Sequence, residues 1–296
     1  MPVDAWDEIR TAYHVARQGT VSGAATELGV HHATVIRHVD ALEARLGTKL
    51  FQRHARGYTA TEAGRDLLQV AQATDDQFTQ LVGRLRGRGE LVSGELVVTS
   101  LAAFSPLLAP VVARFREAHP DVTIRLLNDE RVFRLEYGEA HVALRAGQKA
   151  PDQPDNVVQR LGVMPTGLYA VRAYLDRAGR PRGMNDLPSH RFVGPDNVDS
   201  RAPYNKWLRD AVPERQIVFR CTDSQATLHA VLSGAGLGFI PVWEAARYPD
   251  LVAVVPPQPE WGTGLWLVTH VDLHRTLKVQ TLLAHLKQEA KAWETD

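Results

Sequence analysis

The sequence predicts an α/β protein with an all-helical N-terminal part, and two observations lead to this fold class. Up to about residue 86, apolar residues recur at the three- and four-residue spacings of amphipathic helices. From Ser93 onward, short apolar strands alternate with helical segments, which is typical of an open and largely parallel sheet. The chain has 296 residues, so we expect two or three structural units.

The N-terminal part begins with a helix and continues with two further helices joined at Gly29. Glycine suits a tight turn between helices because it adopts backbone conformations that other residues resist. An upstream helix is marked by Trp6, Ile9, Tyr13 and Ala16. The helix after Gly29 has one buried stripe of residues spaced four, three and four apart: Val35, Val39, Leu42 and Leu46. Its opposite face carries His32, Thr34, Arg37, His38 and Arg45.

This basic face favours a helix that enters the major groove of DNA over an ordinary helical hairpin with a solvated face. A short basic hairpin follows the helix, and it carries Arg53 and Arg56. We expect Arg37 and His32 to face base edges and the two hairpin arginines to contact phosphates. The remaining candidates for DNA contact are His31, Thr34 and His38.

The segment from Thr61 to about Arg86 predicts one long helix. Either a capping box of Thr59 and Glu62 or Thr61 alone begins it. An apolar seam runs along it at alternating four- and three-residue spacings: Leu67, Ala71, Thr74, Phe78, Leu81 and Leu85. Such a seam indicates either pairing with a second copy of the helix or packing on its own domain.

The larger part predicts strands and helices in alternation. The first strands lie at 95–99, 122–127 and 141–145, with helices at 107–115 and 133–137 between them. After Gly162 the strands are expected at 167–171, 191–193, 217–221, 238–240 and 264–269. Helices are expected at 204–210, 224–233 and about 275–293.

The N-terminal motifs together resemble LysR-type transcriptional regulators. The shared pattern is Ala24-Ala25-x-x-Leu28-Gly29-Val30, then Ala41-Leu42-Glu43-x-x-Leu46-Gly47, Leu50-Phe51-x-Arg53 and Thr61-x-Ala63-Gly64. Segments 106–121 and 230–241 are also similar to the family's effector domain. The chain departs from the family at His31 and Ile36, where serine is usual, and at His141, where an acidic residue is usual.

The resemblance implies a winged helix-turn-helix at 1–60, a linker and dimerisation helix at 61–90, and an effector-binding domain at 91–296. That domain resembles periplasmic binding proteins, with two lobes and crossovers near 161–166 and 262–268. It implies a DNA-binding transcriptional regulator that is not an enzyme and needs no cofactor. The implied partners are double-stranded DNA with an interrupted palindrome, a small organic effector that is anionic or aromatic, and further copies in a homodimer or homotetramer. RNA polymerase is a further candidate partner. The alternative is a two-lobed solute-binding or enzymatic domain with a helical appendage.

Ligands of open parallel sheets bind beyond the carboxyl ends of the strands, between the lobes. Hydroxyls and helix starts at those ends favour an anion. The candidate effector residues are Thr99, Ser100, Leu101, Arg145, Gln148, Val193, Asn197, Thr222 and Ser224. For each hydroxyl alone, simple helix capping is the competing interpretation.

Composition and the remaining motifs limit other functions. The 34 basic and 34 acidic residues cancel, so any preference for a charged partner must come from local patches. The single cysteine, Cys221, excludes an internal disulfide and a cysteine-rich zinc site. Gly234–Gly238 precedes a strand, whereas a dinucleotide loop follows one. Neither the N-terminal histidines nor His270 and His274 predict a metal site. No apolar run is long enough to span a membrane and no signal-peptide core is present, so we expect a cytoplasmic protein.

Overall fold

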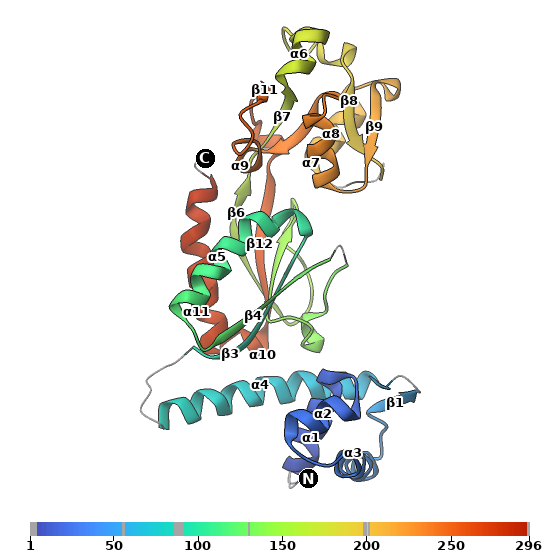
Figure 1. Ribbon diagram of the computed structural model, residues 1–296, viewed down its shortest axis with the longest axis vertical. Coiled ribbons are helices and arrows are strands. Elements are labelled where there is room, and N and C mark those ends of the chain that lie inside the picture. The colour runs from blue at the N-terminus through green and yellow to red at the C-terminus, as the bar shows by residue number, and fades with distance from the viewer. Residues whose placement is uncertain are drawn as a thin grey trace.

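The computed structural model describes residues 5–54, 57–85, 92–129, 131–197, 200 and 202–294. A small helical N-terminal domain lies on one side of a long helix, and two α/β lobes rise on its other side (Figure 1). The lobe nearer the long helix is called the first lobe here, and the distal one the second lobe. The predicted fold class, helical at first and then α/β, is confirmed.

The N-terminal domain consists of three helices and a hairpin, as predicted. Their bounds are α1 Trp6–Gln18, α2 Val21–Leu28, α3 His32–Leu46, β1 Phe51–His54 and β2 Gly57–Ala60. Gly29 ends α2 with a φ of 66°, a conformation that glycine adopts without strain. Val35, Val39 and Leu42 are at most 2% exposed and pack with residues of α1, α2 and β1. The predicted stripe is therefore the core of this domain, except that Leu46 is 52% exposed.

The long helix α4 spans Glu62–Leu85. Thr61 caps it, because its Oγ1 accepts a hydrogen bond from the N–H of Gly64 at 3.1 Å. Thr59 lies inside strand β2, so the alternative capping box with Glu62 is wrong. Leu67 packs against the N-terminal core, which fastens the start of α4 to that domain.

The first lobe is built on a five-stranded sheet with the order β4-β3-β5-β12-β6. The strands are β3 Gly94–Ser100, β4 Val122–Asn128, β5 Val142–Ala146, β6 Asn156–Met164 and β12 Thr263–His270. The helices are α5 Ser105–Ala118, α10 Val271–His274 and α11 Leu277–Ala290, with short 3-10 turns at Ala102–Phe104, Leu135–Tyr137 and Lys291–Glu294. Helices α5 and α11 cover the same side of the sheet (Figure 1), and their apolar residues form the largest core with β3, β5 and β12. The other face packs on the turn around Leu135.

The second lobe holds a three-stranded sheet, β10-β7-β11, beside the pair β8-β9. Its strands are β7 Thr166–Val171, β8 Phe192–Pro195, β9 Ile217–Cys221, β10 Gly238–Pro241 and β11 Leu251–Val255. Its helices are α6 Arg172–Ala178, α7 Pro203–Ala211, α8 Ser224–Leu232 and α9 Val242–Ala245, with 3-10 turns at Leu187–Ser189, Glu214–Gln216 and Pro259–Trp261. An aromatic cluster that includes Trp207, Phe239 and Trp261 fills its interior.

The expectation of a largely parallel sheet is wrong in part. Strand β3 pairs in parallel with β4 and β5, and β8 pairs in parallel with β9. Strand β12 is antiparallel to both β5 and β6, and β7 is antiparallel to both β10 and β11. The antiparallel strands arise because β6 leads up into the second lobe while β12 returns from it (Figure 1). Strands β6 and β11 and helix α6 were not predicted.

Within the described residues, no helix combines the length and the apolar character needed to cross a membrane.

Candidate functional site

The polar side of helix α3 is open to solvent. His31 precedes the helix in an extended conformation and makes no side-chain capping bond. His32 and Arg37 are exposed, whereas Thr34 is half-buried. Arg37 makes no hydrogen bond or ion pair with any other residue that the structure describes. Its guanidinium group is therefore available to an outside acceptor, and it lies opposite the buried stripe of the helix.

His38 is turned partly toward α1. The hydroxyl of Thr11 donates to the backbone oxygen of Asp7 at 2.7 Å, so it must accept from Nδ1 of His38, which lies 2.9 Å away. Thr11 is buried and His38 is half-buried. This contact gives His38 a packing role between α1 and α3, which the sequence reasoning did not foresee.

A buried carboxylate joins α3 to the hairpin. Glu43 is 3% exposed, and its Oε1 accepts the backbone N–H groups of Leu50 and Phe51 at 2.9 and 3.2 Å. Its Oε2 accepts Nζ of Lys49 at 2.7 Å and lies 3.2 Å from Nη2 of Arg53. Burial alone would raise the pKa of Glu43, but the hydrogen bonds from Lys49, Leu50 and Phe51 outweigh it and lower the pKa.

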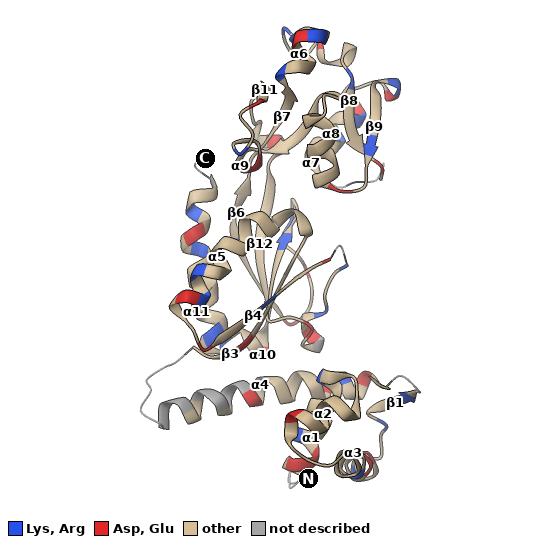
Figure 2. Ribbon diagram, in the orientation of Figure 1, with Lys and Arg blue, Asp and Glu red and all other residues tan. Residues whose placement is uncertain are grey.

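Of the two predicted hairpin arginines, the structure describes Arg53. Arg53 forms ion pairs with both Asp40 and Glu43 and also lies over the ring of Tyr58. It therefore positions the hairpin as well as adding charge to the basic segment that Figure 2 shows at β1. Arg56 lies outside the described residues.

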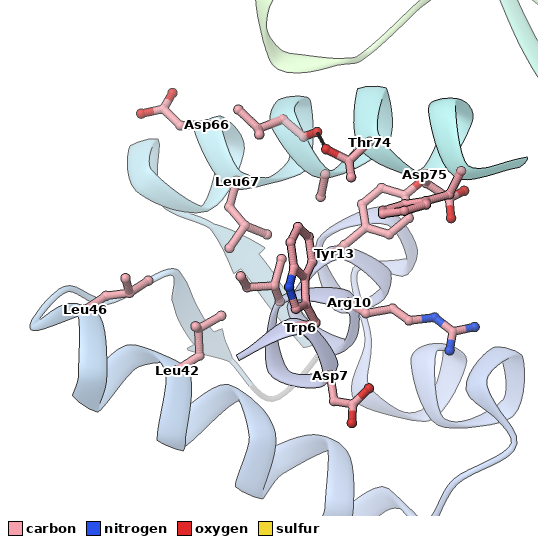
Figure 3. A pocket seen from close by; sticks show the side chains of 14 residues that line it. Trp6, Asp7, Arg10, Tyr13, Leu42, Leu46, Asp66, Leu67, Thr74 and Asp75 are labelled. Carbon is pink, nitrogen blue, oxygen red and sulfur yellow. Dashed lines mark hydrogen bonds between the residues drawn. The ribbon is translucent and has the colours of Figure 1, made fainter. Parts of the chain in front are cut away.

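An apolar groove runs between α1 and α4 (Figure 3). Its volume is about 690 Å³, and its walls include Trp6, Tyr13, Leu67, Val70 and Phe78. The rings of Trp6 and Phe78 meet edge to face at 6.3 Å, yet the two side chains are 56% and 53% exposed. A groove with exposed aromatic walls in a helical domain offers a surface for another apolar element.

The predicted seam of α4 contributes to this groove. Leu67, Ala71, Thr74 and Phe78 line it. Leu81 follows on the helix and is 39% exposed. Leu85 ends α4, and its side chain lies outside the described residues.

A second hollow, of about 640 Å³, lies where the lobes meet. The first lobe contributes Leu101, directly after β3, and the second lobe contributes the rest of the lining. Five of the nine predicted effector residues line it: Leu101, Val193, Asn197, Thr222 and Ser224. The lining also includes Ser200, Tyr204, Asn205, Cys221, Asp223, Thr227 and Phe239. It mixes hydroxyl, amide and apolar groups, as small-molecule sites do.

The other four predicted residues do not line this hollow. Thr99 is 3% exposed, and Ser100 is held by Asn128, whose Nδ2 donates to its Oγ at 2.9 Å. Arg145 donates to the backbone oxygen of Phe133 at 2.9 Å, and Gln148 donates to that of Gly262 at 2.7 Å. These polar groups bond within the first lobe or at the crossover. The polar groups that line the hollow therefore belong to the second lobe.

The side chain that caps α8 is that of Asp223, and not the hydroxyl of Thr222 or Ser224. Its carboxylate accepts the N–H of Ala226 at 2.8 Å, so Asp223 is the cap of this helix. Thr222 and Ser224 are thereby released from capping, and their hydroxyls make no hydrogen bond with a described residue. Tyr204 stacks on Phe239 with ring centroids 5.2 Å apart, and burial raises the pKa of its hydroxyl.

The remaining site chemistry concerns metal-ligating side chains and the one cysteine. No group of three or more histidine, cysteine or acidic side chains suited to a metal ion occurs among the described residues. Burial raises the pKa of the Cys221 thiol, which disfavours the reactive thiolate.

A helix-turn-helix domain that a long helix joins to a two-lobed α/β domain defines a class, the DNA-binding regulators that carry a ligand-binding domain. Family models agree with both parts. The one described as bacterial regulatory helix-turn-helix protein, lysR family, matches residues 6–65, and LysR substrate binding domain matches residues 89–291. The chain belongs to the LysR family of transcriptional regulators.

Relatives and solved structures of similar shape agree with this assignment. The HTH-type transcriptional activator IlvY of Salmonella typhimurium is 36% identical over 253 residues, which cover 83% of this chain and 85% of that protein. Full-length LysG from Corynebacterium glutamicum, solved with bound effector Arg, has a TM-score of 0.66 at 20% identity and covers 97% of this chain and 98% of its own. Full-length CbnR, solved in complex with its target DNA, has a TM-score of 0.55 at 22% identity and covers 96% and 99%. These two structures share the fold with this chain.

Proposed function

We propose that this regulator binds an interrupted palindrome in double-stranded DNA as a homodimer or homotetramer, and that a small organic effector controls it from the interlobe hollow. The observation that carries the proposal is the exposed Arg37 on α3, which pairs with no described residue and lies opposite a buried stripe that anchors the helix in its domain. Such a helix can enter the major groove while the rest of its domain contacts the backbone. CbnR, which shares the fold, is solved on its target DNA.

Within this proposal, Arg37 and His32 contact base edges, and Thr34 and His31 lie at the same exposed end of α3. His38 contributes by holding α1 against α3. Arg53 and Arg56 supply positive charge for phosphates, with Arg53 also locking the hairpin through Glu43. Base contacts confer specificity, whereas phosphate contacts confer affinity on every sequence.

The dimer forms through the groove between α1 and α4. Burying exposed aromatic and aliphatic side chains such as Trp6, Phe78 and Val70 against a second copy removes apolar area from water, which favours association. The six seam residues contact the partner helix, with Phe78 and Leu81 at the centre: Leu67, Ala71, Thr74, Phe78, Leu81 and Leu85.

The effector is a small organic molecule that meets the hydroxyls of Thr222 and Ser224, which bond to no described residue, and the apolar Leu101 and Phe239. An anionic or aromatic compound matches this mixture of helix start, hydroxyls and aromatic rings. LysG, with a bound effector in its structure, shares the two-lobed fold. We assign no enzymatic reaction and no cofactor to the protein, and RNA polymerase is a further proposed partner. We propose that it acts in the cytoplasm, together with the DNA that it binds.

Sequencing the DNA that co-purifies with the protein tests the proposal. The expected result is a small set of fragments that share an interrupted palindrome, protected from nuclease by the wild-type protein. Recovery of fragments with no common sequence, together with equal affinity for unrelated duplexes, would contradict sequence-specific binding. The matches to both LysR models already favour this function over a solute-binding or enzymatic domain with a helical appendage.

A further inference from the structure

Helix α4 has a second contact surface, which faces the first lobe and is polar. The side-chain amide of Gln69 donates to Oδ2 of Asp272 at 2.9 Å and lies 3.1 Å from Nδ1 of His270. One turn further on, the amide of Gln72 lies 3.0 Å from Nε2 of His141. Figure 1 shows α4 passing directly beneath β3 and α10, the elements next to these residues. The two glutamines thus connect the helix to the base of the first lobe.

His141 is built into the first lobe as a hydrogen-bond donor for α4. Its side chain is fully buried, and its Nδ1 accepts the N–H of Val97 at 3.0 Å. Desolvation, together with the nearby charges of Lys278, Arg17 and Arg125, holds the pKa of His141 well below its usual value, so the ring is neutral. A neutral ring that accepts at Nδ1 carries its proton on Nε2. It therefore donates to Gln72, whose amide must present its oxygen at this contact.

Gly138 allows the close approach of the helix. It has a φ of 67°, and a Cβ at this position would lie 2.8 Å from the end of the Gln72 side-chain amide and 3.9 Å from Cα of Gln69. A Cβ here would displace only the end of the flexible Gln72 side chain, whereas the positive φ suits glycine better than other residues. A glycine therefore stands where the first lobe comes close to α4.

This contact is polar, although apolar packing holds each part together. The buried apolar cluster of the N-terminal domain and the clusters of the first lobe share no residue among those described. A cavity of about 400 Å³ with charged walls separates α1 and α4 from the lobe. Arg17 of α1 reaches across to Glu95, with Nη2 and Oε2 3.8 Å apart. Polar interfaces of this kind separate at a small cost compared with apolar ones.

Strand β3 connects this contact to the interlobe hollow. Val97, in the middle of the strand, holds His141, and Leu101 just beyond its end lines the hollow. A displacement of Leu101 at the hollow can therefore be passed along β3 to Val97, His141 and α4.

We propose that Gln69 and Gln72 of α4, with His141, His270 and Asp272 of the first lobe, form a releasable latch that sets the orientation of the two-lobed domain on the linker helix. The latch goes beyond the proposed function, and its test does not depend on which effector binds. Closed, it holds the effector domain and the DNA-binding domain in one arrangement. Open, it frees the two to reorient about the end of α4.

A designed cross-link tests whether the closed latch exists in solution. In a Cys221→Ser background, Gln69→Cys and Gly138→Cys place two thiols across the contact, because an ideal Cβ at position 138 lies 3.9 Å from Cα of Gln69. Mild oxidation of the full-length protein is expected to form this disulfide within one chain, as shown by mass spectrometry of unreduced digests. The Gly138→Cys single variant, checked by circular dichroism, controls for folding. A folded double variant that forms no disulfide, or forms it only between chains, overturns the proposal.

Small-angle scattering tests whether the latch can be released. Gln69→Ala with Gln72→Ala removes both amides, and we expect a larger radius of gyration at an unchanged oligomer mass. Gln258→Ala, which removes an amide bonded to the oxygen of Pro256 in the second lobe, is the matched control and should leave the profile unchanged. The oxidised cross-linked protein should scatter like wild type. An alanine double variant with the wild-type profile overturns the latch even if the cross-link forms.

Discussion

Glu43 in α3 and Arg53 in the hairpin meet with Oε2 and Nη2 3.2 Å apart, and this contact joins the hairpin to α3. The carboxylate is 3% exposed and also accepts two backbone N–H groups from the start of the hairpin. A buried acceptor with this many donors is costly to remove, because each donor is left without its partner. The relative position of α3 and the hairpin, the two elements that we propose contact DNA, therefore depends strongly on this carboxylate.

Glu43→Gln is expected to lower the free energy of unfolding by ~1–3 kcal/mol at neutral pH, because the amide cannot pair with Lys49 and Arg53 as a charge. The effect has a pH signature. The folded-state pKa of Glu43 is lowered, so its stabilisation is complete above the unfolded value of about 4.3 and is lost as the pH falls through the folded value. The difference between wild type and variant in urea unfolding should thus shrink at acid pH. An equal difference at pH 7 and at low pH would contradict this assignment.

Glu214→Gln is the matched control for that measurement. Glu214 also pairs with an arginine, Arg220, at 3.2 Å, but its side chain is 87% exposed. Exposed ion pairs contribute little to stability, so this variant should unfold like wild type.

Arg37→Ala is expected to weaken operator binding by ~1–3 kcal/mol and to relax the preference at one base pair. The reason is that Arg37 is exposed on α3 and is paired with no described residue, so an operator base can occupy its donors. Binding to systematically varied duplexes measures both effects. Arg182→Ala, which removes an exposed arginine from the second lobe, is the control for lost charge. If Arg37→Ala leaves affinity and sequence preference unchanged, another residue reads the base.

Phe78→Asp and Leu81→Asp are each expected to abolish the dimer and tight operator binding while the effector domain stays folded. Each would place a charge in the proposed apolar contact between copies of α4, where desolvation is unfavourable. Analytical ultracentrifugation measures the oligomer. Met184→Asp changes a side chain of similar exposure, 44%, in the second lobe and should leave the oligomer intact. Intact oligomers of both α4 variants would exclude the seam as the interface.

The helices of the N-terminal domain were predictable because their burial follows the apolar spacing. Val35, Val39 and Leu42 recur at helical intervals and are all nearly inaccessible. Strand β6 escaped prediction because it is half-buried along almost its whole length, so its residues show no alternation between a buried and an exposed face. Its position follows from pairing with β12, which lies about a hundred residues away.

The candidate site was predictable only in part, because spacing does not show which polar groups are already bonded. Ser100 and Thr222 look alike in sequence, each at the end of a strand. Asn128 holds the hydroxyl of Ser100, whereas Asp223 caps α8 and the hydroxyl of Thr222 bonds to no described residue. Gln69 and Gln72 carried no signal of their role, since their partners lie in segments distant in the chain.

Thr222→Ala and Ser224→Ala are expected to weaken effector binding, each by roughly 0.5–1.5 kcal/mol, because each removes from the hollow a hydroxyl that bonds to no described residue. A thermal-shift screen of small organic acids and aromatic compounds against the wild-type protein supplies the ligand, since binding to the folded state raises the melting temperature with concentration. The affinity of the best compound is then measured for each variant. Ser100→Ala is the control, because Ser100 bonds to Asn128 and does not line the hollow. If Ser100→Ala weakens binding while the other two bind like wild type, the effector sits against the end of β3 in the first lobe and not in this hollow.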